Sequence, residues 1–446
     1  MNILWTAEEL KTLFSAERGW DVSGVSIDTR SLQPGDLFVA LAGARDGHEF
    51  VEDAFSKGAA AALVSRPMAG NTICVPDTLK AVEALGRLAR ARSRAKALAV
   101  TGSVGKTTVK EMLRRTLSAF GKVHAAEASF NNHIGVPLSL ARMPRDSQFG
   151  IFEIGMNHPG EIAPLAAMVQ PDVALITCVD KAHLGLMGSE LAIAREKASI
   201  YSALAPGGAA IIPGETAYLQ VLREALPPGC QAFLFNGPEA RLLDVLSGPE
   251  NAEIAAEVFD LRLYFRLAAP GRHMASNALA ALTAAAALGL DVEKAAAALS
   301  GFAPYSGRGV QRSLNLSGGR KILLLDESYN ASGASMRAAF SVLKLQPGRH
   351  VAVLGDMLEL GEYTNAEHLA LAPALRDAAD VVFAAGAGCE VLFDALPQAM
   401  QGAHAPDAVS LAPMVKAALR DGDAVLVKGS YGSRMRDVIS ALESGG

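Results

Sequence analysis

Thr101-Gly102-Ser103-Val104-Gly105-Lys106-Thr107-Thr108 lies between an apolar run, Ala97 to Val100, and a segment from Val109 to Phe120 whose apolar residues recur at helical spacing. This order predicts a strand, a Gly-rich turn and a helix. Small residues in such a turn let backbone N–H groups and the helix N-terminus surround a phosphate. We therefore predict a phosphate-binding loop at the carboxyl end of a strand.

The residue types in this loop indicate a nucleotide with a bound magnesium ion. Lys106 would neutralise the outer phosphates, and the Thr107 hydroxyl would coordinate Mg²⁺. The other residues expected to bind the nucleotide here are Gly102, Ser103, Val104, Gly105 and Thr108. The general Walker A pattern also requires a glycine five positions before Gly105, where this sequence has Val100. The alternative is a Gly-rich turn without a ligand, which the flanking strand and helix disfavour.

Two further side chains are expected at the same edge of the sheet. Glu153 ends the apolar strand Gly150 to Ile154, where a carboxylate would hold Mg²⁺ unless it pairs with a neighbouring base. His183 follows the next strand, Val173 to Val179, and is either a second metal ligand or a structural loop histidine.

Two later segments offer groups that would reach a nucleotide. His273 and Asn277 open an Ala-rich helix after Pro270-Gly271, which is a nucleotide contact or an ordinary helix start. Arg308 lies before the last third of the chain, where a cation would reach a phosphate, and an exposed arginine is the alternative.

The chain's 446 residues predict an α/β protein of three domains. Residues 1–96 are expected to form a small α/β domain, with strands at Val22 to Ile27, Leu37 to Leu41 and Ala59 to Val64 and a helix at His48 to Lys57. Residues 97–313 would form a phosphate-loop ATPase with a mostly parallel sheet. Residues 314–446 show four apolar strands separated by helical patterns, which predicts a Rossmann-like, doubly wound domain.

The composition excludes several classes of protein. The formal net charge of -5 disfavours a sequence-independent nucleic-acid binder. The four cysteines form no CxxC pair, and the start MNILWTAEEL lacks a signal peptide's basic segment. The longest uncharged stretch, Met274 to Leu290, is too short and too rich in Ala to cross a bilayer. We expect a cytoplasmic protein, not inserted in a membrane, and a monomer.

Segments along almost the whole chain resemble the Mur ligases. They are DTRSLQPGDLFVALAGARDGHEF (28–50), TGSVGKTTVKE (101–111), NNHIGVPLSL (131–140), FEIGMNHPGEI (152–162), PGRHMASN (270–277), DESYNA (326–331), VLGDMLELGE (353–362) and VLVKGSYGSRM (425–435). The first of these, with LGDMLELGE, favours the members that join D-alanyl-D-alanine to UDP-N-acetylmuramoyl-tripeptide. The resemblance implies that ATP activates the tripeptide carboxylate as an acyl phosphate, which the dipeptide amine attacks.

The same resemblance implies roles for residues in all three domains. The first domain would bind the UDP-muramoyl substrate through Asp28, Thr29, Arg30, Arg45, Asp46, Gly47 and His48, bordered by Asn131, Asn132 and His133. Thr107 and Glu153 would hold one Mg²⁺ and His183 a second. Asn277, Asn330 and Asp356 would contact ATP, together with the Arg308 cation expected above from its position, and Lys428 and Ser430 would bind substrate in the third domain.

Three departures from the family pattern bear on these roles. Met274 replaces an asparagine, Ser332-Gly333 replaces an Asn-Pro-like pair, and Lys197 is followed by Ala198-Ser199 rather than Gly-Glu. A helix-borne Lys197 near His183 would repel Mg²⁺ as an ammonium, so we predict that CO₂ carbamylates it and makes it a ligand of the second ion.

Alternative functions remain open from the sequence. A sister ligase or a folylpolyglutamate-type synthetase adding one amino acid would share the ATPase core. A phosphate-loop switch or transport ATPase would share only the loop.

Overall fold

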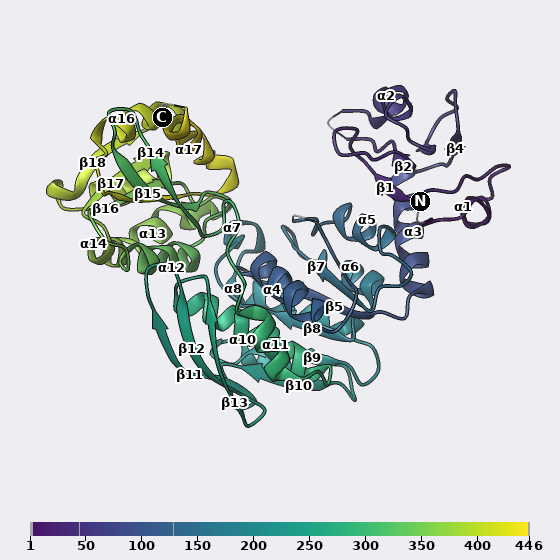
Figure 1. Cartoon of the computed structure of the whole chain (residues 1–446), viewed down its shortest axis with the longest axis horizontal. Coiled ribbons are helices and arrows are strands. Elements are labelled where there is room, and N and C mark those ends of the chain that lie inside the picture. The colour runs from purple at the N-terminus through teal and green to yellow at the C-terminus, as the bar shows by residue number, and fades with distance from the viewer. Residues whose placement is uncertain (1–2, 44, 128, 445–446) are drawn as a thin grey trace.

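The computed structural model describes residues 3–43, 45–127 and 129–444, which form three α/β bodies, each around its own sheet. Figure 1 shows the first and third bodies at opposite ends of the central one. The expected α/β fold with three domains is confirmed. The chain ends, residues 1–2 and 445–446, were expected to belong to the first and third domains and lie outside the described residues.

The first domain has a parallel sheet in the order β1-β2-β3-β4. Its elements are α1 (Ala7–Phe14), β1 (Gly24–Ser26), β2 (Asp36–Val39), η1 (Gly47–Phe50), α2 (Val51–Ser56), β3 (Ala61–Val64), β4 (Thr72–Cys74) and α3 (Thr78–Arg92). The three expected strands occur, and the expected helix is divided between η1 and α2.

The first domain is joined to the central domain by a shared core. Leu138 and Ala141 of the central domain belong to the same buried apolar cluster as Trp5 and Leu10. The indole N–H of Trp5 donates to the Ala141 carbonyl at 3.0 Å. These contacts attach the first domain to the central sheet at a defined place.

The central sheet has the order β13-β12-β11-β10-β9-β8-β5-β7-β6. Its strands are β5 (Lys96–Thr101), β6 (Val123–Ala125), β7 (Phe149–Glu153), β8 (Val173–Ile176), β9 (Ala209–Pro213), β10 (Gln231–Phe235), β11 (Ala240–Ser247), β12 (Ala252–Val258) and β13 (Leu261–Leu267). Its helices are α4 (Lys106–Ser118), α5 (Gly135–Ala141), α6 (Ile162–Val169), α7 (Leu184–Met187), α8 (Glu190–Ala198), η2 (Ser199–Ala203), α9 (Leu219–Glu224), α10 (Arg272–Ala287) and α11 (Val292–Leu299).

Three neighbouring strands of this sheet deliver the polar loops. β5 pairs in parallel with β7 on one side and with β8 on the other. The carboxyl ends of parallel strands meet at one edge of a sheet, so the loops that follow β7, β5 and β8 lie next to one another.

The antiparallel extension formed by β11, β12 and β13 was not predicted. Its alternating burial is visible in β13, where Leu263, Phe265 and Leu267 point inward between exposed residues. This alternation is the ordinary signal of a half-buried antiparallel strand, and it was available in the sequence.

The third domain has a six-stranded sheet in the order β14-β15-β19-β16-β17-β18, in which β14 alone is antiparallel to its neighbour. Its strands are β14 (Val310–Asn315), β15 (Lys321–Glu327), β16 (His350–Gly355), β17 (Val381–Ala385), β18 (Gln401–Ala405) and β19 (Ala424–Lys428). Its helices are α12 (Gly333–Leu343), η3 (Gly361–Tyr363), α13 (Thr364–Leu369), α14 (Ala372–Ala378), α15 (Ala387–Asp394), η4 (Gln398–Met400), α16 (Ala408–Ala418), η5 (Tyr431–Ser433) and α17 (Arg436–Glu443). The boundary expected at residue 313 falls inside β14.

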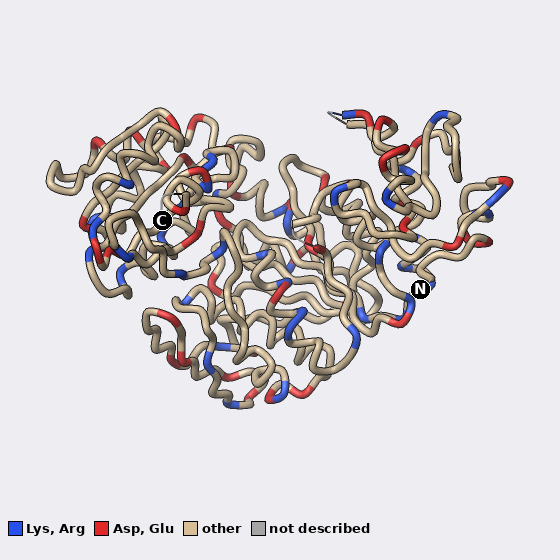
Figure 2. Tube along the Cα trace, turned by 45° about the horizontal axis from the view of Figure 1, so that its top comes forward, with Lys and Arg blue, Asp and Glu red and all other residues tan. Residues whose placement is uncertain are grey.

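Acidic and basic residues are intermixed along the chain in Figure 2. Within the described part of the chain, every helix is too short or too polar to span a membrane.

Glu9 pairs with Arg92 of α3 inside the first domain and with Arg145 of the central domain, so the second ion pair connects α1 to the central domain. Burial raises the pKa of Glu9. A hydrogen bond from the Thr6 N–H and the contact with Arg145 lower this pKa by more than burial raises it, so the net shift is downward. Because the folded-state pKa is depressed, the stabilisation is present above the ordinary pKa of 4.5 and is lost as pH falls through the folded-state value.

We predict that Glu9→Gln lowers the free energy of unfolding by about 1 kcal/mol at pH 7 and that this loss shrinks as pH falls below about 4.5. Urea unfolding at several pH values measures it. Glu17→Gln, at an exposed position of the same domain, is the control. A loss that does not change with pH would contradict the ion-pair interpretation.

Candidate functional site

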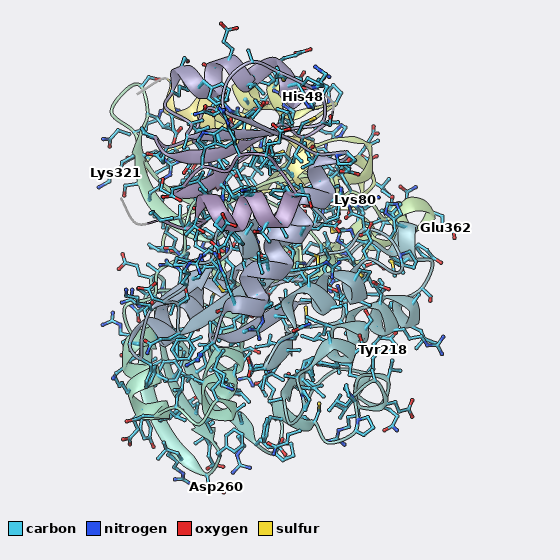
Figure 3. The ribbon with its side chains drawn as sticks, turned by 90° about the vertical axis from the view of Figure 1, so that its right-hand side faces the viewer. His48, Lys80, Tyr218, Asp260, Lys321 and Glu362 are labelled. Carbon is cyan, nitrogen blue, oxygen red and sulfur yellow. The ribbon has the colours of Figure 1, made fainter. Side chains whose placement is uncertain are left out.

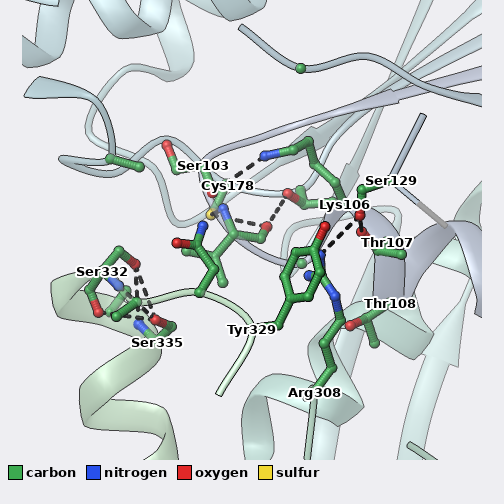
Figure 4. A pocket seen from close by; sticks show the side chains of 18 of the residues that line it. Ser103, Lys106, Thr107, Thr108, Ser129, Cys178, Arg308, Tyr329, Ser332 and Ser335 are labelled. Carbon is green, nitrogen blue, oxygen red and sulfur yellow. Dashed lines mark hydrogen bonds between the residues drawn. The ribbon is translucent and has the colours of Figure 1, made fainter. Parts of the chain in front are cut away.

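A cavity of about 500 Å³ opens between the central and third domains. It is lined by the loop after β5, the segments after β7 and β8, the start of α10, and the polypeptide that leads from Gly307 into α12. Figure 4 shows these side chains converging from both domains. The predicted site residues in its wall are Ser103, Val104, Gly105, Lys106, Thr107, Thr108, Asn131, Asn132, Glu153, His183, Asn277, Arg308, Asn330 and Lys428.

The loop between β5 and α4 is held against the end of β8. The Ser103 N–H donates to the Cys178 carbonyl at 3.0 Å, and the Ser103 hydroxyl donates to the Asp180 carbonyl at 2.8 Å. Gly102 has φ 149°, and a Cβ at this position would lie 1.8 Å from Thr177 Oγ1. Only glycine therefore allows the loop to pack this closely on Thr177.

Lys106 and the first turn of α4 provide positive charge at the cavity wall. Lys106 Nζ donates to the Gly102 carbonyl at 2.6 Å, so the ammonium lies over its own loop. Burial lowers the pKa of Lys106, and the charge of Glu153 opposes this shift. Gly105 caps α4 without a side chain, which leaves the first N–H groups of the helix available to an anion.

Glu153 is almost fully buried at the end of β7, with 1% of its surface exposed. Oε1 accepts a hydrogen bond from Asn131 Nδ2 at 2.9 Å, whereas the buried Oε2 has no hydrogen-bond donor among the described residues. An unpaired buried carboxylate oxygen is costly, and a divalent cation bound by oxygen ligands would remove that cost. Glu153 and the nearby Thr107 hydroxyl therefore fit a magnesium ion.

His183 follows β8 and lines the cavity with a left-handed backbone, φ 65°. Its Nδ1 contacts Glu359 Oε2 of the third domain. Beside it, Lys181 Nζ donates to Glu367 Oε1 at 2.7 Å. The segment that carries His183 is thus also a point of attachment between the two domains.

Lys197 lies behind the cavity wall on α8, with 1% of its surface exposed. Burial and the charge of Lys106 lower its pKa to about 7, against the opposing influence of Cys178 and Glu196. A substantial share of this amine is therefore uncharged at neutral pH.

Arg308 reaches the cavity from the connection between the central and third domains. Its Nη2 donates to Ser129 Oγ at 3.2 Å, and Ser129 Oγ also lies 3.5 Å from the Thr107 hydroxyl oxygen. The guanidinium stacks over the Tyr329 ring, 4.1 Å from its centre, as Figure 4 shows. The Arg308 guanidinium therefore lies beside the phosphate loop and is not simply an exposed cation.

The third domain contributes the buried ammonium group of Lys428 and a second, neighbouring cavity. Lys428 is buried, and its Nζ donates to the Asn330 carbonyl at 2.9 Å and pairs with Glu327 at 3.3 Å. A cavity of about 220 Å³ adjoins the first, is lined by Ser430 and Leu358, and shares His183 with it.

Asp356 at the end of β16 lies outside the linings of both cavities. Its carboxylate accepts a hydrogen bond from the Cys389 N–H at 2.7 Å.

The first-domain residues lie away from the cavity and form two clusters. In one, Asp28 binds Arg30 through Nε at 2.9 Å, and Thr29 lies between them in the sequence. In the other, His48 Nδ1 is 2.6 Å from Asp46, and the Ser65 N–H donates to His48 Nε2 at 2.8 Å, which makes His48 a buried structural anchor. Figure 3 shows His48 at the far end of the molecule from Asp260.

The remaining predicted substrate-binding residues do not share one environment. Arg45 and Gly47 lie beside the cluster of Asp46. Asn132 Oδ1 accepts from the N–H of Gly135, the first residue of α5, at 2.9 Å, and His133 is exposed.

Three family models cover most of the chain: "Mur ligase family, catalytic domain" at residues 21–103, "Mur ligase middle domain" at 100–285, and "Mur ligase, glutamate ligase domain" at 314–431. A UDP-N-acetylmuramoyl-tripeptide–D-alanyl-D-alanine ligase from Synechocystis is 35% identical over 94% of this chain and 92% of its own. This chain is a Mur ligase.

Solved structures of Mur ligases have the same architecture. MurF from Acinetobacter baumannii is 30% identical, with a TM-score of 0.87 over 99% of each chain. MurF from Thermotoga maritima in complex with ADP is 26% identical, with a TM-score of 0.80 over 95% of this chain and 98% of that one.

The departures of this Mur ligase from the family pattern have structural counterparts. Met274 is buried in the cavity wall, so an apolar group lies where an amide was expected. Ser332 caps α12, where its hydroxyl accepts from the Ser335 N–H. Gly333 is thus the first residue of a capped helix rather than part of a loose loop.

Some cavity residues were not predicted from the sequence. Ser129, Cys178 and Tyr329 all line the site. Tyr329 lies inside DESYNA, beside the predicted Asn330, so its position in the motif was a usable signal. Cys178 comes just after the end of β8, so its strand was a usable signal, whereas Ser129 has no local signal, because only the tertiary fold places it beside the phosphate loop.

We predict that Gly102→Ala lowers the free energy of unfolding by about 3 kcal/mol, because a methyl group would collide with Thr177. Gly207→Ala is the matched control, since φ is also positive, at 74°, but no heavy atom lies within 4 Å of the added carbon. Denaturant unfolding measures both. Equal losses in the two variants would contradict the close packing of the loop.

Proposed function

We propose that this Mur ligase uses ATP to join D-alanyl-D-alanine to UDP-N-acetylmuramoyl-tripeptide in the synthesis of peptidoglycan precursors. The similarity to the Synechocystis ligase over nearly all of both chains supports the choice of substrates. The single structural observation that carries the chemistry is that Lys106 and Glu153 line one cavity, with a buried Glu153 oxygen that has no donor among the described residues.

ATP would lie in the larger cavity with its phosphates on the loop of residues 102–108. Lys106 would move from the Gly102 carbonyl to the outer phosphates, and α4 would direct its N-terminal N–H groups at them. Arg308 would reach the same phosphates, while Asn277 and Asn330 would contact the rest of the nucleotide. Asp356 would take part only if the loop after β16 moves towards the cavity.

Glu153 and Thr107 would hold one Mg²⁺, and His183 with Lys197 a second. When bound, the ions supply charge neutralisation for the phosphates. His183 would offer Nε2 to the ion while Nδ1 keeps its contact with Glu359, which would orient the ring.

The UDP-muramoyl end would bind the first domain through the residues around Asp28 and Asp46, with Asn131, Asn132 and His133 beyond. Its tripeptide would extend towards the phosphate loop. The dipeptide would bind in the smaller cavity, where Ser430 lines the wall, with Lys428 in the lining of the adjoining larger one.

The reaction requires little acid–base chemistry from the protein. A carboxylate oxygen of the tripeptide attacks the γ-phosphorus of ATP, and the bond to the β-phosphate oxygen breaks, giving an acyl phosphate and ADP. The dipeptide amine then attacks the acyl carbon, loses a proton, and phosphate leaves. Lys106, Arg308 and the N-terminus of α4 would stabilise the transferred charge, and the three domains would align three substrates.

Lys197 is proposed to be carbamylated. CO₂ adds only to an uncharged amine and releases a proton, and the depressed pKa of about 7 provides that amine. The carbamate would carry negative charge and oxygen ligands to the second Mg²⁺. The protein is further proposed to act in the cytoplasm as a monomer, and the limits 1–96, 97–313 and 314–446 are proposed as its domains.

An assay that omits one component at a time tests this function. Product and phosphate should form only when ATP, Mg²⁺, a UDP-muramoyl tripeptide and D-alanyl-D-alanine are all present. Lys106→Ala should remain folded and lose about 100-fold or more of the rate, because its charge is used on phosphate. Lys122→Ala, at an exposed position, is the control. Phosphate release without the dipeptide would favour a switch ATPase, and use of a single amino acid would favour a sister ligase.

Substitutions of Asp28 or Arg30 in the first domain should weaken the use of the UDP substrate and leave the use of ATP nearly unchanged. We predict that Asp28→Ala or Arg30→Ala raises KM for the UDP substrate about tenfold or more and changes KM for ATP less than twofold, because a charged hydrogen bond contributes about 1.5–3 kcal/mol. Steady-state kinetics measures both constants. Equal increases would argue against a separate UDP site in the first domain.

Lys197→Ala should be nearly inactive, because it removes the proposed carbamate. Short-chain carboxylates such as acetate should restore part of the rate by filling the vacated space with oxygen ligands. Lys344→Ala, at an exposed position of the third domain, is the control. A fully active Lys197→Ala protein would rule out the carbamate, and an inactive one without rescue would argue for a purely structural lysine.

A further inference from the structure

Glu196 is a buried carboxylate that binds the backbone of another segment. It precedes Lys197 on α8, with 9% of its surface exposed. Its Oε2 accepts a hydrogen bond from the Gly160 N–H at 2.8 Å, and its Oε1 accepts one from the Ile162 N–H at 2.9 Å. Burying a charge is costly unless donors satisfy it, and here both donors lie at the start of α6, where the helix dipole also favours an anion.

The segment that Glu196 holds, residues 155–161, forms part of the large cavity. Gly155, Met156, Asn157 and Glu161 line it. Within the segment, the carboxylate of Glu161 accepts from the Asn157 N–H at 2.7 Å.

At its beginning the Gly155 N–H donates to the Asn131 carbonyl at 2.8 Å. The path of the segment is therefore fixed at one end by Asn131 and at the other by Glu196.

The place of residues 155–161 in the central sheet indicates which substrate they would contact. It leaves the sheet at the end of β7, between β5, which carries the phosphate loop, and β6. Beyond it α5 packs on the first domain, where Arg142 Nε donates to the Val25 carbonyl at 2.7 Å. Residues 155–161 thus share the cavity wall with the phosphate loop, and the helix they lead into, α6, contacts α5, which packs on α3 of the first domain.

We propose that Glu196 is a positioning residue for the peptide substrate, because it shapes residues 155–161 into the surface along which the tripeptide reaches the phosphate loop. This inference rests on the proposed function, in which the UDP end binds the first domain and the terminal carboxylate meets ATP. The ligand of the segment is the peptide tail, and the recognising groups are the polar side chains of Asn157 and Glu161.

Glu196→Gln tests the proposal with little change in volume. The amide retains one acceptor oxygen and loses the other, so one of the two backbone donors is left without a partner. Glu239→Gln is the matched control: the Glu239 carboxylate also accepts from a backbone N–H, that of Leu234 in β10 at 3.0 Å, and β10 lies on the other side of β5 from β7.

Amide hydrogen exchange and steady-state kinetics are measured for each variant and for the wild-type protein. In the ligand-free protein, hydrogen exchange of the Gly160 and Ile162 amides should be about tenfold faster in Glu196→Gln. In the assay, KM for the UDP-muramoyl tripeptide should rise about tenfold, KM for ATP should change less than twofold, and kcat should fall less than KM rises. Glu239→Gln should leave all of these unchanged.

An unchanged KM for the tripeptide, or equal changes in both KM values, would overturn the proposal, because a purely structural residue would not favour one substrate. Glu196→Asp keeps the charge but cannot reach both donors, and it is judged by the same criteria if Glu196→Gln does not fold. A wild-type protein that forms no product from the tripeptide would refute the proposed function, whereas unchanged amide exchange in the variants would refute the anchor itself.

Discussion

The carboxylate of Glu153 is the constraint on which the site depends. Its strand buries it in the cavity wall, Asn131 donates to one oxygen, and the other oxygen has no donor among the described residues. A charge in this position is tolerated only if a cation balances it. Lys106, Thr107 and Arg308 are arranged around the same space, so a nucleotide with its metal ion would complete the charge balance.

The three domains are arranged around this one site of charge balance. The central sheet brings the loops after β7, β5 and β8 to one edge. The first domain is attached through the shared core around Trp5. The third domain meets the same edge through Lys181, His183 and the stacked pair of Arg308 and Tyr329. Under the proposed function this arrangement would align three substrates, and most of the catalysis would be alignment and electrostatics.

Much of the site could be predicted from the sequence, because the residues concerned lie where strands end. The phosphate loop, Glu153 and His183 each follow an apolar strand, and parallel strands bring such positions together. What could not be predicted depends on contacts distant in the chain. The pairing of Glu196 with Gly160 and Ile162 and the contact of His183 with Glu359 are set by packing between helices and loops. The strands at residues 240–267 were missed although β13 alternates regularly; in β11 a bulge between Leu242 and Asp244 interrupts the alternation.

The most direct measurement of the central claim is anomalous diffraction from crystals of the protein grown with Mn²⁺ and a non-hydrolysable ATP analogue. The account predicts a manganese peak about 2.1 Å from Glu153 Oε2 and from the Thr107 hydroxyl, with the analogue's phosphates on the loop of residues 102–108. The same peak should be absent from Glu153→Gln crystals in which the analogue is still bound. A nucleotide bound elsewhere, or a metal ion that leaves Glu153 Oε2 without a partner, would contradict it.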